Sequence, residues 1–329
     1  MNTIKIRIAF IGAGSIGSLF GGYLANIISE EYKIEINFFG REAHITAINE
    51  NGLILEKGSE EILIDNINGY TNILDYLKHN SGDSFKFLFL TTKTYDIIEA
   101  LSEYQELIQR TDWVVILQNG IGNEDIVKNF ISKHKIIRGI TSNGALIPHP
   151  GKVKHTGIGF TRIGFPFKDD IPEGEKEGAI EDLGLLAELM SRAGIKTEIV
   201  DDIIRNCWEK IFVNIGINAF GALTRLKNGE LIKREKLRNL IRDAIEEALV
   251  IARKRNINLT NKDYVEVCFD VARKTKDNIN SMLQDVLKGK KTEIDFINGR
   301  IVTYSEDEDQ VPINRTITCL IKGLEESQL

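Results

Sequence analysis

Cysteine is scarce in this chain, with three residues among 329. Cys207, Cys268 and Cys319 lie far apart, and no CxxC pair occurs. Scattered thiols in an odd number argue against a disulfide scaffold and a cysteine-rich metal site, and they fit a reducing compartment. The five histidines are also dispersed, without an HExxH or similar metal-ligand spacing. The sequence therefore predicts no metal centre.

Long apolar runs and an excess of positive charge are also missing. No apolar stretch approaches the roughly 20 residues that a membrane-spanning helix needs. The net charge is −6, so no overall basic field attracts nucleic acid or an anionic membrane. Residues 1–10 resemble a signal peptide in their apolar character, but glycines follow at once without a cleavage site, which favours a buried first strand. We expect a cytoplasmic protein that binds neither nucleic acid nor membrane.

The order of predicted elements divides the chain in two. Up to about residue 200, strands alternate with helices, which predicts an α/β domain with a mainly parallel sheet. From residue 201 to 329 we expect an all-α domain, because proline is absent from Ile203 to Val311 and few strand signals occur. The predicted strands are Ile4–Ile11, Lys33–Phe39, Phe85–Thr91, Trp113–Leu117, Lys135–Ile140 and Lys196–Val200, with a hairpin over Lys152–Phe165, and the helices of this half include Ile97–Gln109, Asn123–Phe130 and Ile180–Ala193.

A GxGxxG motif joins the first predicted strand to the first predicted helix. Its first glycine permits a tight turn, its second lets the backbone approach a pyrophosphate, and its third lets the helix pack closely on the strand. Free N–H groups at the helix N-terminus favour the phosphate charge. The alternative is a glycine turn that serves packing alone. The predicted dinucleotide-binding residues are Gly12, Ala13, Gly14, Ser15, Ile16 and Gly17.

The end of the second predicted strand bears on the choice of nucleotide. An acidic residue there would bind the ribose 2′-hydroxyl of NAD, but Phe39 and Gly40 lead directly into Arg41. A guanidinium group suits a phosphate, so NADP(H) is favoured, although Glu42 follows and Arg41 alone also fits a solvated surface charge. The missing carboxylate also argues against a methyltransferase, another class that uses glycine-rich turns.

Two further strand ends carry polar residues. Ligands of parallel sheets bind beyond the carboxyl ends of the strands, and Lys93 and Asn119 follow two such strands. Lys93 is placed to contact the nucleotide ribose or phosphates, and Asn119 to bond both cofactor and substrate. The alternatives are a solvated lysine and an ordinary Asn-Gly turn.

A polar stripe lies in the otherwise apolar segment 208–220. Lys210, Asn214 and Asn218 are four residues apart, so they share one helix face. Polar groups in such a helix must be satisfied or face a cleft. One interpretation is a substrate-lining stripe with Lys210 as proton donor, and the other is a buried polar network between helices.

A second polar cluster lies further along the chain. Asn278, Ser281 and Asp285 share a predicted helix face, and Glu293 begins another helix with Thr292 as a plausible cap. An acidic residue in a first helical turn is ordinary dipole complementarity, and spacing alone favours that interpretation for Glu293.

Several motifs together resemble one family. IGAGSIG, TTKTYD, LQNGIGNED, WEKIFVNIGINAFGALTRLKNGEL and NSMLQDVLKGKKTEIDFING occur in this order from about residue 8 to 300. In these motifs the chain resembles the ketopantoate reductases, or 2-dehydropantoate 2-reductases. The resemblance implies an N-terminal Rossmann-type domain and an all-helical C-terminal domain, with the active site between them, and NADPH-dependent reduction of 2-dehydropantoate to pantoate. Asp96 departs from some members, which have an amide there.

The resemblance also implies roles for residues. Lys210 is the general acid, with Glu293 as the acidic residue near it and near the nicotinamide ribose. Arg41 and Lys93 match contacts to the adenosine phosphate and ribose, and Asn119 lies near both substrate and nicotinamide. Gly144 belongs to a variable stretch near the nicotinamide. The remaining substrate contacts implied are Asn214, Asn218, Asn228 and Ser281.

Two other functions stay open at this point. One is NADPH-dependent reduction of another small 2-keto acid, and the other is a non-catalytic NADPH-binding sensor. All-helical second domains often mediate dimers, so a homodimer is one expected assembly, although no residue of the sequence specifies it.

Overall fold

The chain forms two compact units. The computed structural model describes residues 3–80 and 82–327. The first unit holds the chain up to Gln118 together with Asn123–Ile203, and the second holds Asn119–Gly122 together with the chain from Ile204 onward. The short segment Asn119–Gly122 therefore belongs to the second unit although its neighbours in sequence belong to the first.

An eight-stranded sheet organises the first unit, in the order β12-β11-β8-β7-β6-β1-β2-β5. Neighbouring strands are parallel except for β11 and β8, which are antiparallel. The mainly parallel sheet confirms the α/β Rossmann-type prediction. The strands are β1 (Ile4–Ile11), β2 (Tyr32–Phe39), β5 (Ile67–Tyr70), β6 (Phe85–Leu90), β7 (Thr111–Ile116), β8 (Ile136–Thr141), β11 (Thr161–Gly164) and β12 (Thr197–Ile199).

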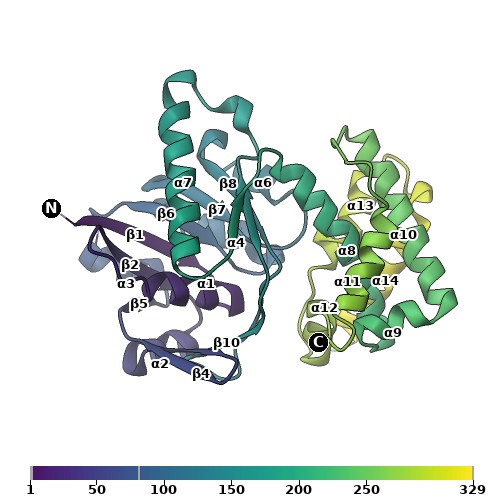
Figure 1. Cartoon of the computed structure of the whole chain (residues 1–329), viewed down its shortest axis with the longest axis horizontal. Coiled ribbons are helices and arrows are strands. Elements are labelled where there is room, and N and C mark those ends of the chain that lie inside the picture. Colours follow the sequence, from purple (N-terminus) through teal and green to yellow (C-terminus); the bar gives the residue numbers. More distant parts are fainter. Residues whose placement is uncertain (1–2, 81, 328–329) are drawn as a thin grey trace. The chain divides into compact units, whose positions relative to one another are not determined.

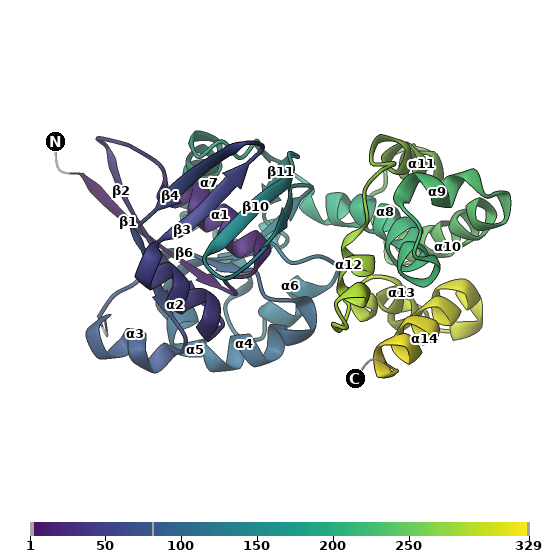
Figure 2. The ribbon, with the colours of Figure 1, turned by 90° about the horizontal axis from the view of Figure 1, so that it is seen from below.

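Helices cover both faces of this sheet. Because side chains alternate along a strand, Ile8 and Phe10 of β1 join one apolar cluster and Ala9 and Ile11 join the other. Figure 1 shows α1 and α7 on the first face, and Figure 2 shows α3, α5, α4 and α6 in a row along the second. The helices are α1 (Ser15–Ala25), α2 (Glu42–Asn51), α3 (Ile73–Asn80), α4 (Ile97–Glu103), α5 (Gln105–Gln109), α6 (Asn123–Val127) and α7 (Lys176–Arg192).

A second sheet of four strands packs against α1, in the order β4-β3-β10-β9. It corrects the predicted hairpin over Lys152–Phe165, because β10 pairs with β3 and β9 whereas β11 pairs with β8 and β12. Apolar residues of β3 and β10 join the core of the first face, where both strands pack against α1. The strands are β3 (Leu53–Lys57), β4 (Glu60–Ile64), β9 (Gly144–Leu146) and β10 (Lys152–Gly157).

The second unit is helical over its described residues, as predicted. Its helix α10 packs against α9, α11, α13 and α14 (Figure 1). At Gly216, α8 approaches α10 and α11 so closely that an added Cβ would lie 2.5 Å from the Cys268 sulfur. The helices are α8 (Ile203–Thr224), α9 (Asn228–Lys233), α10 (Glu235–Lys254), α11 (Tyr264–Lys274), α12 (Ser281–Leu287), α13 (Asn298–Tyr304) and α14 (Pro312–Glu326). Within residues 3–80 and 82–327, no helix has the length and apolarity needed to cross a bilayer.

Candidate active site

The three glycines of the GxGxxG motif meet different surroundings. Gly12 has a φ of +101°, and a Cβ there would lie 2.5 Å from the Thr92 backbone nitrogen. A Cβ on Gly17 would lie 2.2 Å from the Gly12 carbonyl oxygen. Gly14 has an ordinary φ of −81°, and a Cβ there would meet no atom within 4 Å. The fold thus requires the first and third glycines, whereas the second leaves open space above the turn.

The open space lies at the start of α1. Helix α1 begins at Ser15, and its N-cap Gly14 offers no side-chain hydrogen bond. The N–H groups of the first helical turn have no acceptor within the helix. These groups and the helix dipole suit an anion. The six residues predicted to bind a dinucleotide therefore form one turn with an open end.

The end of β2 is tied to this turn. The Phe39 carbonyl oxygen accepts hydrogen bonds from the Gly12 nitrogen at 2.9 Å and from the Ala13 nitrogen at 3.1 Å. A Cβ on Gly40 would lie 2.8 Å from the Ala13 Cβ. The next residue, Arg41, is exposed at the N-cap of α2. Its position next to the turn fits a phosphate contact.

Threonines after β6 and a glutamine after β7 also support the turn, and the sequence analysis missed them. The Thr91 hydroxyl donates to the Gly12 carbonyl oxygen at 2.7 Å. The Gln118 amide donates to the Thr92 hydroxyl at 2.9 Å and to its carbonyl oxygen at 3.1 Å. Lys93 follows, partly buried, as the N-cap of a 3₁₀ turn over Thr94–Asp96. Their place at the carboxyl end of the sheet was the signal available in the sequence.

Gly144 lies elsewhere in the first unit, at the start of β9. It pairs with Gly157 of β10, and a Cβ on it would lie 2.9 Å from the Thr156 hydroxyl oxygen. Strand β9 packs against α1. Gly144 therefore belongs to the second sheet and not to the strand ends of the large one.

The second unit brings three predicted residues together. The Lys210 ammonium group on α8 donates to the Asn119 side-chain oxygen at 2.9 Å. The Asn119 amide nitrogen donates to a Glu293 carboxylate oxygen at 3.1 Å. An ammonium, an amide and a carboxylate thus form a continuous chain, in which Glu293 is buried and Lys210 is partly exposed. The two bonds define the orientation of the amide, since its oxygen accepts and its nitrogen donates.

Glycines seat Asn119 in the helical unit. Gly120 has a φ of +86°, and a Cβ there would lie 2.6 Å from the Phe296 carbonyl oxygen. Gly122 has a φ of +79°, and a Cβ there would lie 2.3 Å from the Tyr304 hydroxyl. These close approaches explain why the segment after β7 needs glycine at both positions.

The other predicted polar residues lie on separate elements. Asn214 and Asn218 continue the Lys210 face of α8, and neither side chain hydrogen-bonds another described residue. Asn228 is buried at the start of α9, where its amide donates to the Thr275 hydroxyl at 2.9 Å while its buried side-chain oxygen has no partner among the described residues. Ser281 is the exposed first residue of α12.

The helical patterns around Ser281 and Glu293 differ from those predicted. Asn278 precedes α12, whose N-cap is Asn280, and its side-chain oxygen accepts from the Leu283 nitrogen at 2.9 Å. Glu293 is the N-cap of a 3₁₀ turn over Ile294–Phe296 and not the start of an α-helix. The buried Glu293 carboxylate is engaged by Asn119, so dipole complementarity alone does not describe it.

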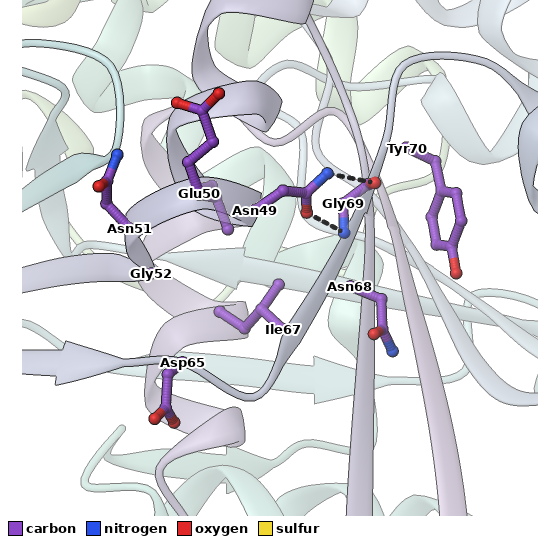
Figure 3. A pocket seen from close by; sticks show the side chains of 10 residues that line it. Asn49, Glu50, Asn51, Gly52, Asp65, Ile67, Asn68, Gly69 and Tyr70 are labelled. Carbon is purple, nitrogen blue, oxygen red and sulfur yellow. Dashed lines mark hydrogen bonds between the residues drawn. The ribbon is translucent and has the colours of Figure 1, made fainter.

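A surface depression of about 540 Å³ lies between α2 and the edge strand β5. Figure 3 shows the Asn49 side chain there, accepting from the Gly69 nitrogen at 2.9 Å and donating to its carbonyl oxygen at 3.0 Å. Asn49 thus hydrogen-bonds the backbone N–H and C=O groups of Gly69, to which an additional strand would otherwise pair at this sheet edge. Residues 3–80 and 82–327 contain no cluster of three or more histidine, cysteine or acidic side chains suited to a metal ion.

Comparison with known proteins agrees with this geometry. The family model described as ketopantoate reductase PanE/ApbA matches residues 8–166, and its C-terminal counterpart matches residues 202–325. A Pyrococcus horikoshii protein named 2-dehydropantoate 2-reductase is 36% identical over 324 residues, covering 97% of this chain and 98% of the relative. An Archaeoglobus fulgidus protein of the same name is 30% identical, covering 97% and 98%.

Solved structures share the whole fold. A PanE/ApbA family ketopantoate reductase from Ralstonia eutropha superposes with a TM-score of 0.82 at 25% identity, covering 98% of this chain and 99% of that one. D-mandelate dehydrogenase in complex with NADH and anilino(oxo)acetate gives a TM-score of 0.84 at 26% identity, with the same coverage. This chain therefore belongs to the ketopantoate reductase family of oxidoreductases, which have a Rossmann-like NAD(P)-binding fold.

Proposed function

We propose that this chain reduces 2-dehydropantoate to pantoate with NADPH, and that Lys210 is the general acid. The observation that carries the proposal is the chain of bonds from the Lys210 ammonium through Asn119 to the buried Glu293 carboxylate. The names of the relatives from Pyrococcus and Archaeoglobus support the choice of substrate. A protein that only sensed the dinucleotide would have no need of a charged proton donor held in this way.

The residues of the first unit fit a nicotinamide dinucleotide. The open space above Gly14 and the free N–H groups at the start of α1 suit its pyrophosphate. Exposed Arg41, with no carboxylate at the end of β2 before it, suits the additional phosphate of NADPH. When bound, this cofactor supplies the hydride that reduces the keto carbon.

Lys210 supplies the proton. As the keto carbon is reduced, negative charge develops on its oxygen, and an ammonium group donating to that oxygen stabilises the charge and then protonates the alkoxide. A lysine side chain is ordinarily protonated near neutral pH, so it starts in the donating form. The Glu293 carboxylate offsets the positive charge through the Asn119 amide.

Amide groups are proposed to hold the substrate. Asn214 and Asn218 lie on the same face of α8 as Lys210 and have no hydrogen bond to another described residue. Each has both a donor and an acceptor for the carboxylate and hydroxyl of a 2-keto acid. Asn228 and Ser281 remain proposed contacts on the strength of the family resemblance, as do Lys93 and Gly144 for the cofactor.

The alternative is reduction of another 2-keto acid. The structural similarity to D-mandelate dehydrogenase, with a TM-score of 0.84, favours an acid with an aryl group as that alternative. Side-chain packing around the polar stripe would then decide between the two substrates.

Steady-state kinetics test the proposal. We would measure kcat/KM for 2-dehydropantoate, 2-oxoisovalerate and phenylglyoxylate, each with NADPH and with NADH. We expect 2-dehydropantoate to be preferred, and NADPH to be favoured over NADH by about tenfold or more through charge-assisted bonds to Arg41. Faster reduction of phenylglyoxylate would support the mandelate-type alternative, and no turnover with any acid would support a sensor.

An Arg41→Ala variant tests the cofactor assignment. The ratio of kcat/KM with NADPH to that with NADH should fall towards one, while kcat/KM with NADH changes little. Lys33→Ala is the matched control, since it removes an exposed cation from the start of β2, at the opposite end of that strand from Arg41. An unchanged ratio in Arg41→Ala would exclude this residue as the phosphate contact.

A further inference from the structure

A buried histidine links three separate elements of the first unit. His44 is the third residue of α2, and its side chain is 7% exposed. Its Nε2 lies 3.0 Å from the Ser18 hydroxyl oxygen on α1, and its Nδ1 accepts from the Gly151 backbone nitrogen at 3.1 Å. Both ring nitrogens are therefore occupied, one by the helix that follows the glycine turn and one by the loop before β10.

These contacts define where each proton lies. A backbone N–H group only donates, so the His44 Nδ1 that faces Gly151 carries no proton. The ring proton is on Nε2, which donates to the Ser18 oxygen. The Ser18 hydroxyl then donates to the Ala13 carbonyl oxygen at 3.1 Å. The result is a one-way chain of hydrogen bonds from Gly151 through His44 and Ser18 to Ala13.

The chain of hydrogen bonds ends inside the glycine turn. Because the peptide group is planar, holding the Ala13 carbonyl oxygen also orients the N–H group of Gly14. The Ser18 backbone nitrogen donates to the Gly14 carbonyl oxygen at 2.8 Å, so Ser18 holds both sides of this residue. The backbone around Gly14 is where the pyrophosphate is expected to approach.

The same histidine lies close to the second proposed phosphate contact. His44 comes three residues after Arg41, and its backbone nitrogen donates to the Arg41 carbonyl oxygen at 3.1 Å. Tying the first turn of α2 to α1 therefore sets the position of Arg41 relative to the glycine turn.

We propose that His44, neutral and protonated on Nε2, is a positioning residue that sets the geometry of the dinucleotide phosphate site through Ser18. The inference rests on the proposed function, because it assumes that the turn binds NADPH. A well-formed site avoids the cost of ordering the turn when the ligand binds. Loss of this chain of bonds should weaken cofactor binding without slowing the chemical step.

Two substitutions of His44 separate its two bonds. His44→Gln retains a donor near the position of Nε2, so it can still bond Ser18, whereas His44→Asn retains an acceptor near Nδ1 for Gly151 but does not reach Ser18. We expect His44→Gln to keep the Kd for NADPH within about twofold, and His44→Asn and Ser18→Ala to raise it between about threefold and tenfold. The kcat at saturating NADPH should stay near that of the unaltered protein.

Tyr23→Phe is the matched control. Tyr23 lies on the same helix, five residues after Ser18, and its hydroxyl lies 2.8 Å from the Nδ1 of a partly buried histidine, His155. Removing the Tyr23 hydroxyl also breaks a hydrogen bond between α1 and a histidine, but this bond does not touch the glycine turn. We expect it to lower the melting temperature and to leave the Kd for NADPH unchanged.

The measurements are fluorescence titration with NADPH, kcat and melting temperature for each variant. Because Ser18 transmits the effect, the double variant His44→Asn/Ser18→Ala should bind no more weakly than Ser18→Ala alone. Equal losses of affinity in Tyr23→Phe and Ser18→Ala, or an unchanged Kd in His44→Asn, would overturn the proposal. If the unaltered protein binds neither NADPH nor NADH, the proposed function fails first, and this inference fails with it.

Discussion

At the scale of single residues, two glycines of the GxGxxG motif have different roles: Gly17 is needed for packing, and Gly14 leaves space for a ligand. A Cβ at position 17 would lie 2.2 Å from the Gly12 carbonyl oxygen, whereas a Cβ at position 14 would meet open space. Gly17→Ala should therefore lower the free energy of unfolding by about 1–3 kcal/mol, as overpacking does. The measurement is urea-induced unfolding, and an unaltered midpoint would contradict the assigned packing role.

Gly14→Ala should give the opposite result. Its backbone has a φ of −81°, which alanine adopts freely, so the unfolding midpoint should not fall. The added methyl group occupies the space proposed for phosphate, and a steric cost of about 1–3 kcal/mol corresponds to a Kd for NADPH raised about fivefold or more. Normal NADPH affinity in this variant would show that the dinucleotide does not approach the turn here.

Lys210 carries the chemistry in the proposed mechanism. Lys210→Ala should lower kcat by about 100-fold or more, because a general acid contributes on that order, while the Kd for NADPH stays the same. Lys262→Ala is the control, since that lysine is exposed and pairs with Glu209 in the same unit. A Lys210→Ala enzyme with near-normal turnover would remove Lys210 from the mechanism.

At the scale of elements, buried strands were predictable and the second sheet was not. The second half of β1 and most of β6 and β7 are buried on both faces, so these stretches read as nearly continuous apolar runs. The strands β3 and β4 are short and carry charged residues, and β3 pairs with β10 from a distant part of the chain. Local patterns contain no record of such distant pairing, which is why the hairpin prediction was wrong.

The candidate site shows the same division. The four-residue spacing of Lys210, Asn214 and Asn218 identified a polar helix face from sequence alone. That Asn119 would bond the lysine depends on the path of the chain, since 91 residues separate the two. The roles of His44 and Thr91 were missed because their partners are backbone groups and a serine, which no sequence pattern marks.

Arg138 shows how one buried charge supports the strand ends. Its side chain is 1% exposed on β8, and it donates to the Ile116 carbonyl oxygen at 2.9 Å, to that of Gly139 at 2.8 Å and to that of Gln118 at 2.9 Å. Its Nε also lies 3.5 Å from a Glu124 carboxylate oxygen. The guanidinium group therefore joins the end of β7 and the middle of β8 to the start of α6.

Arg138→Met should be strongly destabilising. It would leave the Glu124 carboxylate and several carbonyl groups buried without their hydrogen-bond donor. Breaking a buried ion pair in this way costs about 3–5 kcal/mol of stability. Arg110→Met is the control, because Arg110 pairs with Glu106 on the surface, where such a pair contributes less than about 1 kcal/mol. Urea-induced unfolding measures both, and adding Glu124→Gln to Arg138→Met should recover part of the loss.

At the scale of the whole molecule, the proposed cofactor site and the proposed proton donor belong to different units. The first holds the glycine turn, Arg41 and the strand-end residues, and the second holds the chain from Lys210 to Glu293. Asn119 reaches the second unit because the chain leaves the first after Gln118 and returns at Asn123. A substitution in the first unit should therefore affect cofactor binding, and a substitution in the second should affect the chemical step.

Stability of the molecule should depend on pH through buried His44 and partly buried His155. Burial lowers the pKa of His44, and burial together with the nearby Lys57 charge lowers the pKa of His155, despite the opposing hydrogen bond to Gly157. An unfolded histidine has a pKa of about 6.5. Below that pH the unfolded chain takes up protons that the folded chain does not, so stability is full above about 6.5 and falls as the pH drops towards the folded pKa values.

Carboxyl groups with a lowered pKa change the folding stability at a lower pH than the histidines do. The hydrogen bonds from Lys152 and Lys154 lower the pKa of Glu56 from a usual value of about 4.5, so its contribution is lost only in more acidic solution. The loss between pH 6.5 and 5 should therefore belong mainly to the histidines. Urea-induced unfolding across this range should show a smaller decline in a His44→Gln/His155→Gln variant, whereas substitution of the exposed His79 should change nothing. An equal decline in the double variant would mean that other groups take up the protons, because only a group whose pKa differs between the two states can couple folding to pH.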